Sequence, residues 1–356
     1  MYHFGHTSKL YSELAILCRS LLDYLPASIS VGTVTGEMSG TENAHGAAGR
    51  IKRGVSYLKQ HTIGQSVWCS GVGLHSGLKV ALVLKPAPAG HGIRFVRTDI
   101  PASPSISANY NNVVSSFQAT TIGSAGVCVS TVEHLMAALY GCRVDNVLVE
   151  LKGPEAPIFD GSAEPYVKLI RKALLVEQDE PRNYLAISKP LTVTRGDSFI
   201  KATPSDKFQV FYEIDYPHPR VGKQQYSFAL KNGNFVSEIA KARTFGFLKD
   251  VRKLQEMGLI QGGSLSNAVV FDDSEMLNSE GFRFSDECVR HKILDFIGDL
   301  ALTGLPMLGM FNIRKAGHTL HSCFLNELMG GKGYAIPTSV LVPPTYFPPQ
   351  VSAFAR

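Results

Sequence analysis

The chain has 356 residues, of which 44% are hydrophobic and 18% are charged, so it is long and apolar enough to form two globular domains with sizeable cores. Its 35 basic and 30 acidic residues leave a formal net charge of only +5, and no basic block is interleaved with aromatic residues, which argues against a nucleic-acid partner. The six cysteines are scattered without close pairs, a pattern typical of reduced thiols in a cytoplasm rather than of a disulfide framework.

The first 58 residues differ from the rest of the chain. An apolar stretch at residues 10–25 is interrupted by charged residues and is not followed by a cleavage site, so it predicts neither an export signal nor stable membrane insertion. Residues 32–54 are rich in small and polar residues and predict a flexible link. We therefore expect residues 1–58 to be a disordered extension. A membrane- or partner-binding helix on a tether, and an upstream start that is not used because Met38 offers another, are the alternatives.

Beyond residue 58, strand-like and helix-like patterns follow one another twice. Hydrophobic periodicity predicts strands over 79–84, 93–97 and 146–151 and helices over 132–140 and 166–175. It then predicts strands over 185–193, 199–203 and 208–214 and a long helix over 286–302. Residues 177–182 are charged, contain a proline and form the best boundary. The chain is therefore expected to be an α+β protein of two similar halves, 59–180 and 181–336, with a proline-rich tail at 337–356 that packs as an extended chain or is partly mobile.

The most informative stretch is the predicted helix at 286–302, which carries His291 and Asp295 four positions apart. At that spacing both side chains lie on one face, where an imidazole nitrogen and a carboxylate oxygen can reach the same divalent metal ion. A surface hydrogen-bonded pair is the alternative. Because a catalytic zinc usually takes three protein ligands, the metal hypothesis requires a third group elsewhere in the chain.

Two further stretches can supply that group. Glu133 and His134 stand side by side at the start of an apolar, Ala-rich segment, and Ser130 or Thr131 can cap the helix that begins there. His318 follows a glycine after a short apolar run, where we expect the backbone to turn sharply or to approach another group closely. Each of these residues alone is more often structural. Their joint occurrence in a chain with few charges favours a metal site.

Taken together, these segments resemble the motifs of the UDP-3-O-acyl-N-acetylglucosamine deacetylase family, zinc amidases that perform the committed step of lipid A synthesis in Gram-negative bacteria. The matching motifs keep their order along the chain: Gly71–Gly77, Lys85–Pro88, Ser130–Leu139, Val144–Asn146, Pro154–Ala163, Ala242–Phe247, Gly262–Ser264, Arg290–Leu300 and Ala316–His318. The resemblance implies two similar sheet-and-helix domains, each a two-layer sandwich, packed face to face with the active site between them.

The metal ligands implied by the resemblance are His134, His291 and Asp295, which are also the groups that spacing nominates. Zn²⁺ is the implied metal. Fe²⁺ is the alternative, because two histidines and one carboxylate with open coordination positions also suit iron.

The resemblance also implies the catalytic groups around the metal. It makes Glu133 the general base and His318 the group that protonates the departing amine. Thr244, Lys292 and Asp299 fall in the supporting shell. The Thr244 hydroxyl is a candidate donor to the oxyanion, and Asp299, one helical turn beyond Asp295, is expected to orient His318.

The implied substrate is a UDP-linked, acylated amino sugar. Its long acyl chain needs an apolar passage, and the corresponding residues here are Phe245, Leu248, Val251, Ile260, Leu265 and Val270. Ordinary core residues of an amphipathic unit are the alternative. Arg243, with Lys241 and Lys292, is a candidate contact for the phosphates or the sugar.

Two positions depart from the family pattern. Ala119 stands where some members have a cysteine near the metal, and Leu320-His321-Ser322 replaces a run that more usually contains asparagines. Neither change removes a predicted catalytic group. We therefore expect a cytoplasmic, monomeric, metal-dependent amidohydrolase. Another zinc hydrolase with the same ligands, or a nonenzymatic binding protein on the same fold, are the competing hypotheses.

Overall fold

The computed structural model describes residues 30–32, 56–231, 233–339 and 341–342. The chain divides into a unit of residues 1–30 and a compact unit of residues 31–356, and the second unit contains all the helices of the described residues. The predicted disorder of residues 1–58, with its alternatives, lies almost entirely outside the described residues. Within that segment, β1 is the short strand Ser30–Gly32, and β2 (Ser56–Tyr57) pairs with β22 (Leu341–Val342).

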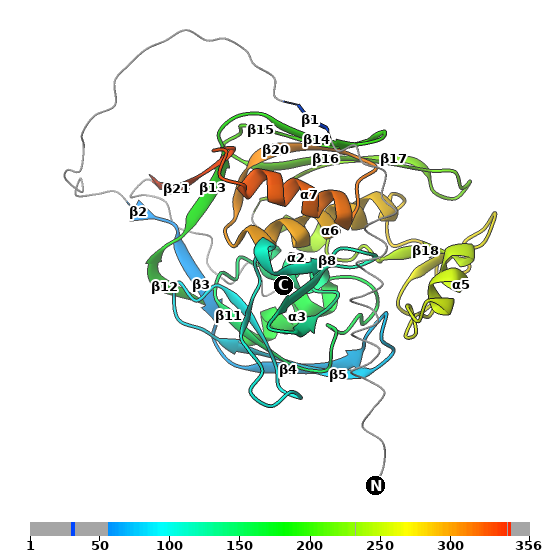
Figure 1. Cartoon of the computed structure of the whole chain (residues 1–356), viewed down its shortest axis with the longest axis horizontal. Helices are drawn as coiled ribbons and strands as arrows, with labels where there is room; N and C mark the ends of the chain where they lie inside the picture. Colours follow the sequence, from blue (N-terminus) through cyan, green and yellow to red (C-terminus); the bar gives the residue numbers. More distant parts are fainter. Residues whose placement is uncertain (1–29, 33–55, 232, 340, 343–356) are drawn as a thin grey trace. The chain divides into compact units, whose positions relative to one another are not determined.

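The first half is built on a sheet with the strand order β4 (Val67–Val72), β5 (Lys79–Pro86), β11 (Val147–Lys152), β6 (Ile93–Arg97) and β7 (Ile106–Ser107). Along β5, Val80, Leu82 and Leu84 are buried while the residues between them are more exposed, so one face of the sheet meets the core. Helices α2 (Glu133–Gly141) and α3 (Glu164–Ala173) lie on that side of the sheet (Figure 1).

Smaller sheets complete this half. The 3-10 helix η1 (Tyr110–Asn112) precedes a three-stranded sheet of β8 (Val113–Ser115), β9 (Thr121–Ser124) and β10 (Val127–Val129). Strand β3 (Lys59–Ile63) pairs with β12 (Leu175–Pro181). Only residues 130–132 separate β10 from α2, so this sheet leads directly into the turn of α2 that carries Glu133 and His134.

The second half repeats the arrangement around a larger sheet. Its strands include β14 (Leu191–Arg195), β15 (Ser198–Thr203), β20 (Met307–Arg314), β13 (Asn183–Ile187) and β21 (Ala335–Ser339) in that order, with β16 (Phe208–Tyr216) between β20 and β17 (Gly222–Ala229). Helices α6 (Glu287–Leu300) and α7 (His318–Met329) lie on the side that faces the first half (Figure 1). The short helices are α4 (Asn234–Glu238) and η2 (Ala301–Thr303).

An inserted β-α-β unit separates β17 from α6. It consists of β18 (Phe245–Phe247), α5 (Leu248–Glu256) and β19 (Val269–Phe271), and its two strands are parallel. The predicted acyl-passage residues all belong to this unit and its loops.

The two halves meet through their helices, with α2 packed against α6. A glycine makes this contact close, because a Cβ atom on Gly298 would lie 2.0 Å from the carbonyl oxygen of Glu133. Any larger residue at 298 would push α6 away from the start of α2. The order sheet, helices, helices, sheet confirms the predicted α+β class with two sheet-and-helix layers (Figure 1).

Most predicted elements appear within one or two residues of their expected limits, but three regions differ. The strand predicted over 185–193 is two strands, β13 and β14, separated by residues that include Pro190. The predicted boundary at 177–182 lies largely in β12, and the start of the predicted tail lies in β21. The domain limits 59–180 and 181–336 remain a prediction, since residues 31–356 form one compact unit.

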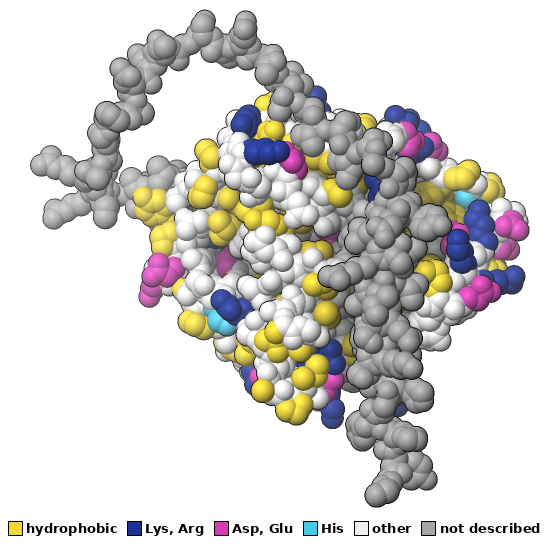
Figure 2. Space-filling model, viewed as in Figure 1, with side chains coloured by type: hydrophobic (Ala, Val, Ile, Leu, Met, Phe, Trp, Pro, Cys, Tyr) yellow, Lys and Arg dark blue, Asp and Glu magenta, His cyan; other side chains and the backbone are white. Residues whose placement is uncertain are grey.

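The surface and the cysteines agree with the composition. On the face shown in Figure 2, lysine and arginine side chains lie beside acidic ones rather than in one basic block. The cysteines of the described residues, Cys69, Cys128, Cys142, Cys288 and Cys323, are all free. In the same part of the chain, none of the helices combines the length and apolar character needed to cross a membrane.

Candidate metal centre and active site

Helix α2 brings Glu133 and His134 into the interior, where both side chains are buried. The predicted capping of this helix is wrong: the residue at the N-cap is Val132, and no side chain caps the helix there. Thr131 instead adopts a left-handed conformation with φ of 55°, and its hydroxyl donates a hydrogen bond to Glu155 at 2.8 Å. This turn aims the first residues of α2 at α6.

Helix α6 carries His291, Asp295 and Asp299 at intervals of four residues, and all three are buried. A period of four on a helix with 3.6 residues per turn keeps the side chains on a slowly winding stripe. That stripe faces α2, so the groups from both helices meet in the interior.

Nitrogens of His134 and His291 converge with a carboxylate oxygen of Asp295, and the candidate ligand atoms lie within 4.8 Å of one another. The His134 Nε2 atom is 3.7 Å and the His291 Nε2 atom is 3.2 Å from Asp295 Oδ1. The Nδ1 atom of His291 lies 3.1 Å from the carbonyl oxygen of Ala242, so Nδ1 carries the proton and Nε2 is free to bind a cation. The donor set therefore fits a divalent metal ion.

The electrostatic setting of these groups also fits a cation. Burial, followed by the neighbouring His291, lowers the pKa of His134 to about 3, which keeps this imidazole neutral. Burial opposes ionisation of Asp295, but His291 and Lys292 hold its pKa well below the usual range. Neutral imidazoles and an ionised carboxylate are the forms that bind metals.

A second cluster lies beside the first and consists of Asp299, His318 and His321. Nδ1 of His318 and Nδ1 of His321 are each 2.7 Å from the same Asp299 oxygen, Oδ2. The Thr120 hydroxyl donates to the other oxygen, Oδ1, at 2.5 Å. Burial disfavours both charges, yet the mutual attraction of Asp299 and His318 lowers the pKa of the acid to about 2 and raises the pKa of the imidazole to about 10. They form an ion pair.

Glu133 lies between the two clusters. One of its oxygens is 3.8 Å from His318 Nε2, and the other accepts a hydrogen bond from the Thr120 amide at 3.1 Å. Burial raises the pKa of Glu133 to about 8. A carboxyl group whose pKa lies near neutrality is suited to exchange a proton with a reacting molecule.

A cavity of about 710 Å³ opens onto these groups. It is lined by the predicted catalytic and metal residues Glu133, His134, Thr244, His291, Lys292, Asp295 and His318. The predicted passage residues Phe245, Leu248, Val251, Ile260, Leu265 and Val270 line it as well. Asp299 lies behind His318 rather than in the wall. One continuous cavity therefore joins the polar centre to an apolar arm.

The predicted phosphate or sugar contacts have different surroundings. Lys292 lines the cavity, and its amine donates to Asp295 Oδ2 at 3.0 Å. Lys241 is exposed and is not in the cavity wall. Arg243 is only 3% exposed and does not line the cavity, because its guanidinium is engaged by Glu287 and Glu280. In this structure Arg243 is a buried structural cation and makes no contact with the cavity.

The sharp turn predicted before His318 is present but lies elsewhere. Lys315 takes the left-handed conformation with φ of 49°, whereas Gly317 is extended and serves as the N-cap of α7. The turn places His318 at the first position of α7 and aims its ring at Glu133 and Asp295.

Sequence reasoning missed Thr120, Glu287 and the role of His321. His321 follows His318 at helical spacing, and Glu287 precedes His291 at the same spacing, so both could have been found from the pattern. Thr120 gave no such signal, because it is 179 residues from Asp299 in sequence. Ala119, next to it, is buried.

Comparison with known proteins identifies a family that this chain is similar to. The family model described as UDP-3-O-acyl N-acetylglycosamine deacetylase matches residues 60–330. A UDP-3-O-acyl-N-acetylglucosamine deacetylase of Myxococcus xanthus is 48% identical over 274 residues, which cover 77% of this chain and 87% of the relative. Proteins of the same name from Citrifermentans bemidjiense and Acidithiobacillus ferrooxidans are 46% and 45% identical, each over 76% of this chain and over 88% and 90% of the relative.

Proposed function

This chain belongs to the UDP-3-O-acyl N-acetylglycosamine deacetylase family. We propose that its buried centre of histidines and carboxylates hydrolyses the N-acetyl group of UDP-3-O-acyl-N-acetylglucosamine in lipid A biosynthesis. Water and UDP-3-O-acyl-N-acetylglucosamine give acetate and UDP-3-O-acyl-glucosamine, with cleavage of one linear amide bond. The observation that carries the proposal is the convergence of three candidate ligand atoms beside Glu133 at the end of one cavity.

His134, His291 and Asp295 are proposed to hold Zn²⁺, with Fe²⁺ as the alternative. When bound, the cation supplies a Lewis acid that polarises the amide carbonyl and lowers the pKa of water to about 7. The Ala242 carbonyl keeps His291 in the tautomer whose Nε2 faces the cation. Lys292 holds the second oxygen of Asp295 and offsets its charge.

Glu133 is proposed as the general base. Its carboxylate removes the proton of the water that attacks the acetyl carbon, and Thr120 orients it through its amide. The distance of 3.8 Å from Glu133 to His318 Nε2 supports the proposal that the base and the acid act on the same reacting group.

His318 is proposed to act as the acid. The ion pair with Asp299 keeps the imidazole protonated at Nδ1 and Nε2, so that Nε2 can donate to the amine that leaves. The Thr244 hydroxyl, in the cavity wall, is the proposed donor to the oxyanion of the tetrahedral intermediate.

The apolar arm of the cavity is proposed to hold the acyl chain. Phe245, Leu248, Val251, Ile260, Leu265 and Val270 line it and offer no charge. Lys292 is the proposed contact for the sugar or the phosphates. Arg243 is not among the proposed substrate contacts, because its guanidinium is buried against Glu287.

We also propose that the protein works in the cytoplasm as a monomer. The free cysteines of the described residues are typical of a reducing compartment. Both halves of the site come from one chain, so a single copy is sufficient. Light scattering of the purified protein and fractionation of cells would check these two points.

The function is tested by acetate release from UDP-3-O-acyl-N-acetylglucosamine, with and without a chelator, and with metal content determined on the same sample. We expect chelator-sensitive release that returns with about one equivalent of zinc per chain. If a folded, zinc-loaded protein releases no acetate, the substrate is wrong and a panel of other amides would identify a different zinc hydrolase. If it binds neither zinc nor another divalent metal, the metal centre is wrong as well.

A further inference from the structure

Residues 242–244 form an irregular segment between α4 and β18, and two residues of this segment contact the site. The Ala242 carbonyl oxygen lies 3.1 Å from Nδ1 of His291, and Thr244 lines the cavity. The Thr244 carbonyl is fixed by the Val269 amide at 2.8 Å, but the Ala242 carbonyl belongs to no helix or strand. The contacts of Arg243, the residue between the two, therefore help to set its position.

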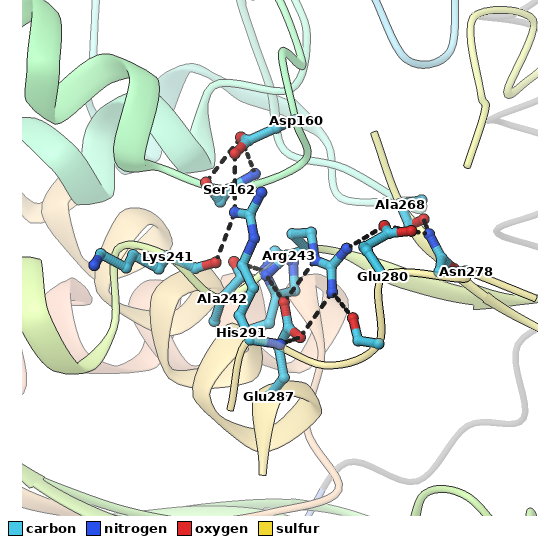
Figure 3. Close-up of polar contacts among 12 residues, drawn as sticks. Asp160, Ser162, Lys241, Ala242, Arg243, Ala268, Asn278, Glu280, Glu287 and His291 are labelled. Atoms are coloured by element: carbon cyan, nitrogen blue, oxygen red, sulfur yellow. Dashed lines mark hydrogen bonds and ion pairs between the residues drawn. The ribbon is translucent and has the colours of Figure 1, made fainter. Parts of the chain in front are cut away.

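The Arg243 side chain does not line the cavity, and Glu287 and Glu280 hold its guanidinium (Figure 3). Its Nε and Nη2 atoms donate to the two oxygens of Glu287 at 2.9 and 3.1 Å, and its Nη1 atom donates to Glu280 at 2.7 Å. Nη2 also donates to the Gly281 carbonyl at 2.7 Å. The backbone amide of Arg243 donates to Glu287 as well, at 2.9 Å. Both the side chain and the main chain of Arg243 are thus fastened to Glu287.

Glu287 is the first residue of α6 and lies one helical turn before His291. Its carboxylate is 1% exposed and accepts four hydrogen bonds, three from Arg243 and one from the Arg283 amide. The segment and the helix are therefore joined at two successive turns, by Arg243 to Glu287 and by Ala242 to His291. The contact between Arg243 and Glu287 therefore helps to set the distance between the Ala242 carbonyl and His291.

The same segment is anchored to the first half of the molecule. The Thr244 amide donates to the Gly161 carbonyl at 2.8 Å, and Arg283 bridges the Lys241 carbonyl and Asp160. A Cβ atom on Gly161 would lie 2.2 Å from the Asn267 carbonyl oxygen, so the loop fits closely against its neighbours. Because His134 comes from the first half and His291 from the second, these contacts join the two halves that supply the two imidazoles.

We propose that Arg243 and Glu287 are positioning residues for the metal centre: they hold the Ala242 carbonyl against Nδ1 of His291, so that Nε2 of His291 is presented to the cation. The inference rests on the proposed ligand set of His134, His291 and Asp295. A hydrogen-bond partner on the distal nitrogen of a ligating histidine fixes its tautomer and orientation, and the loss of such a partner weakens metal binding by roughly 10–100-fold.

A positioning role of Arg243 and a simple effect of its charge predict different changes in the affinity for Zn²⁺. If Arg243 acted only through its charge, removing a cation near the site would strengthen the binding of another cation or leave it unchanged. The change Arg243→Lys keeps the charge but cannot supply the fork of donors that reaches Glu287, Glu280 and Gly281 together. A loss of metal affinity in this variant therefore comes from geometry.

The experiment compares Zn²⁺ dissociation constants, measured by chelator competition, for the parent protein, Arg243→Lys and a matched control. The control is Arg182→Lys, because Arg182 is another buried arginine, paired with Asp145 at 2.8 Å, that contacts neither the segment 242–244 nor a proposed ligand. Thermal unfolding is followed by circular dichroism on the same samples. We expect both variants to unfold at lower temperature, but only Arg243→Lys to bind Zn²⁺ about 10–100-fold more weakly.

Unchanged Zn²⁺ affinity in a folded Arg243→Lys protein, or an equal loss in the control, would overturn the inference. If Arg243→Lys does not fold, Glu280→Ala replaces it, since Glu280 is more than half exposed and its loss removes the acceptor of the Arg243 Nη1 hydrogen bond. That variant should bind Zn²⁺ more weakly than the parent, and parent-like binding would then overturn the inference. His291→Ala separates the two proposals: if the parent binds Zn²⁺ no better than this variant, the proposed ligand set itself is wrong.

Discussion

The interior of this protein holds two clusters made of the same residue types, two histidines and an aspartate, but they are bonded in different ways. Around Asp299, two imidazole Nδ1 atoms approach one oxygen to 2.7 Å and a threonine hydroxyl occupies the other oxygen. Around Asp295, the imidazole Nε2 atoms stand at 3.2 and 3.7 Å from the nearer oxygen. The contacts around Asp299 are hydrogen bonds, whereas the longer distances around Asp295 leave room for a cation.

Residue composition alone therefore does not identify a metal site. In the Asp299 cluster the Nδ1 atoms and both carboxylate oxygens are already used in hydrogen bonds, so a metal would have to displace them. In the Asp295 cluster, His134 Nδ1 has no hydrogen-bond partner among the described residues, and His291 is held from behind by a backbone carbonyl. The pattern of hydrogen bonds behind each candidate ligand distinguishes the two clusters.

The largest effect is expected from His291→Ala, which removes a proposed ligand from the Asp295 cluster. The variant should bind no stoichiometric zinc and should release no detectable acetate, because two remaining ligands do not form a catalytic site. Metal analysis and acetate release on one sample check this. His91→Ala, in a loop of the first half and outside both clusters, is the control and should retain both properties.

Glu133→Ala should separate metal binding from catalysis. Since Glu133 is not a member of either cluster, the variant should keep about one zinc per chain, while acetate release falls by about 10³–10⁴-fold through loss of the general base. Glu150→Ala, which breaks a pair with Lys85 outside the cavity, serves as the control. Activity close to that of the parent in a pure, folded Glu133→Ala protein would remove Glu133 as the base.

The sequence predicted the convergence of the candidate ligands around Asp295 better than the contacts around Asp299. The spacing of His291 and Asp295 is a property of one helix, and Glu133 beside His134 is a local signal at the start of another. The Asp299 cluster depends on contacts between distant segments, since Thr120 reaches α6 across a gap of 179 residues. Helical spacing can place residues on one face, but it cannot predict which remote loop meets that face.

Arg243 shows the same limit. A lysine or arginine near an active-site motif is by default expected to meet solvent or substrate, yet this side chain is buried. Its partner Glu287 lies 44 residues away, and the pairing depends on how the segment 242–244 packs on the start of α6. The turn before His318 was predicted from Gly317, but the left-handed residue is Lys315. Its conformation is set by tertiary structure rather than by local preference.

His318→Ala tests whether the Asp299 cluster supplies the proton that the departing amine takes up. The variant should fold and bind zinc like the parent, and acetate release should fall by about 10²–10³-fold because the departing amine loses its acid. Loss of zinc from a folded His318→Ala protein would place this histidine among the metal ligands and would contradict the separation of the two clusters.

The smallest effect is expected from Thr120→Val, which keeps the shape of the side chain and removes the hydroxyl that donates to Asp299 Oδ1. One hydrogen bond is worth about 1 kcal/mol, so kcat should fall by about 3- to 10-fold while zinc content stays at the parent level. Thr121→Val is a matched control, because the neighbouring hydroxyl donates to Ser130 rather than to Asp299. If both variants lose the same activity, the effect comes from the packing of β9, and Asp299 needs no support from Thr120. If only Thr120→Val is slow, then the threonine contributes to the ion pair of Asp299 and His318 across the interface of the two halves.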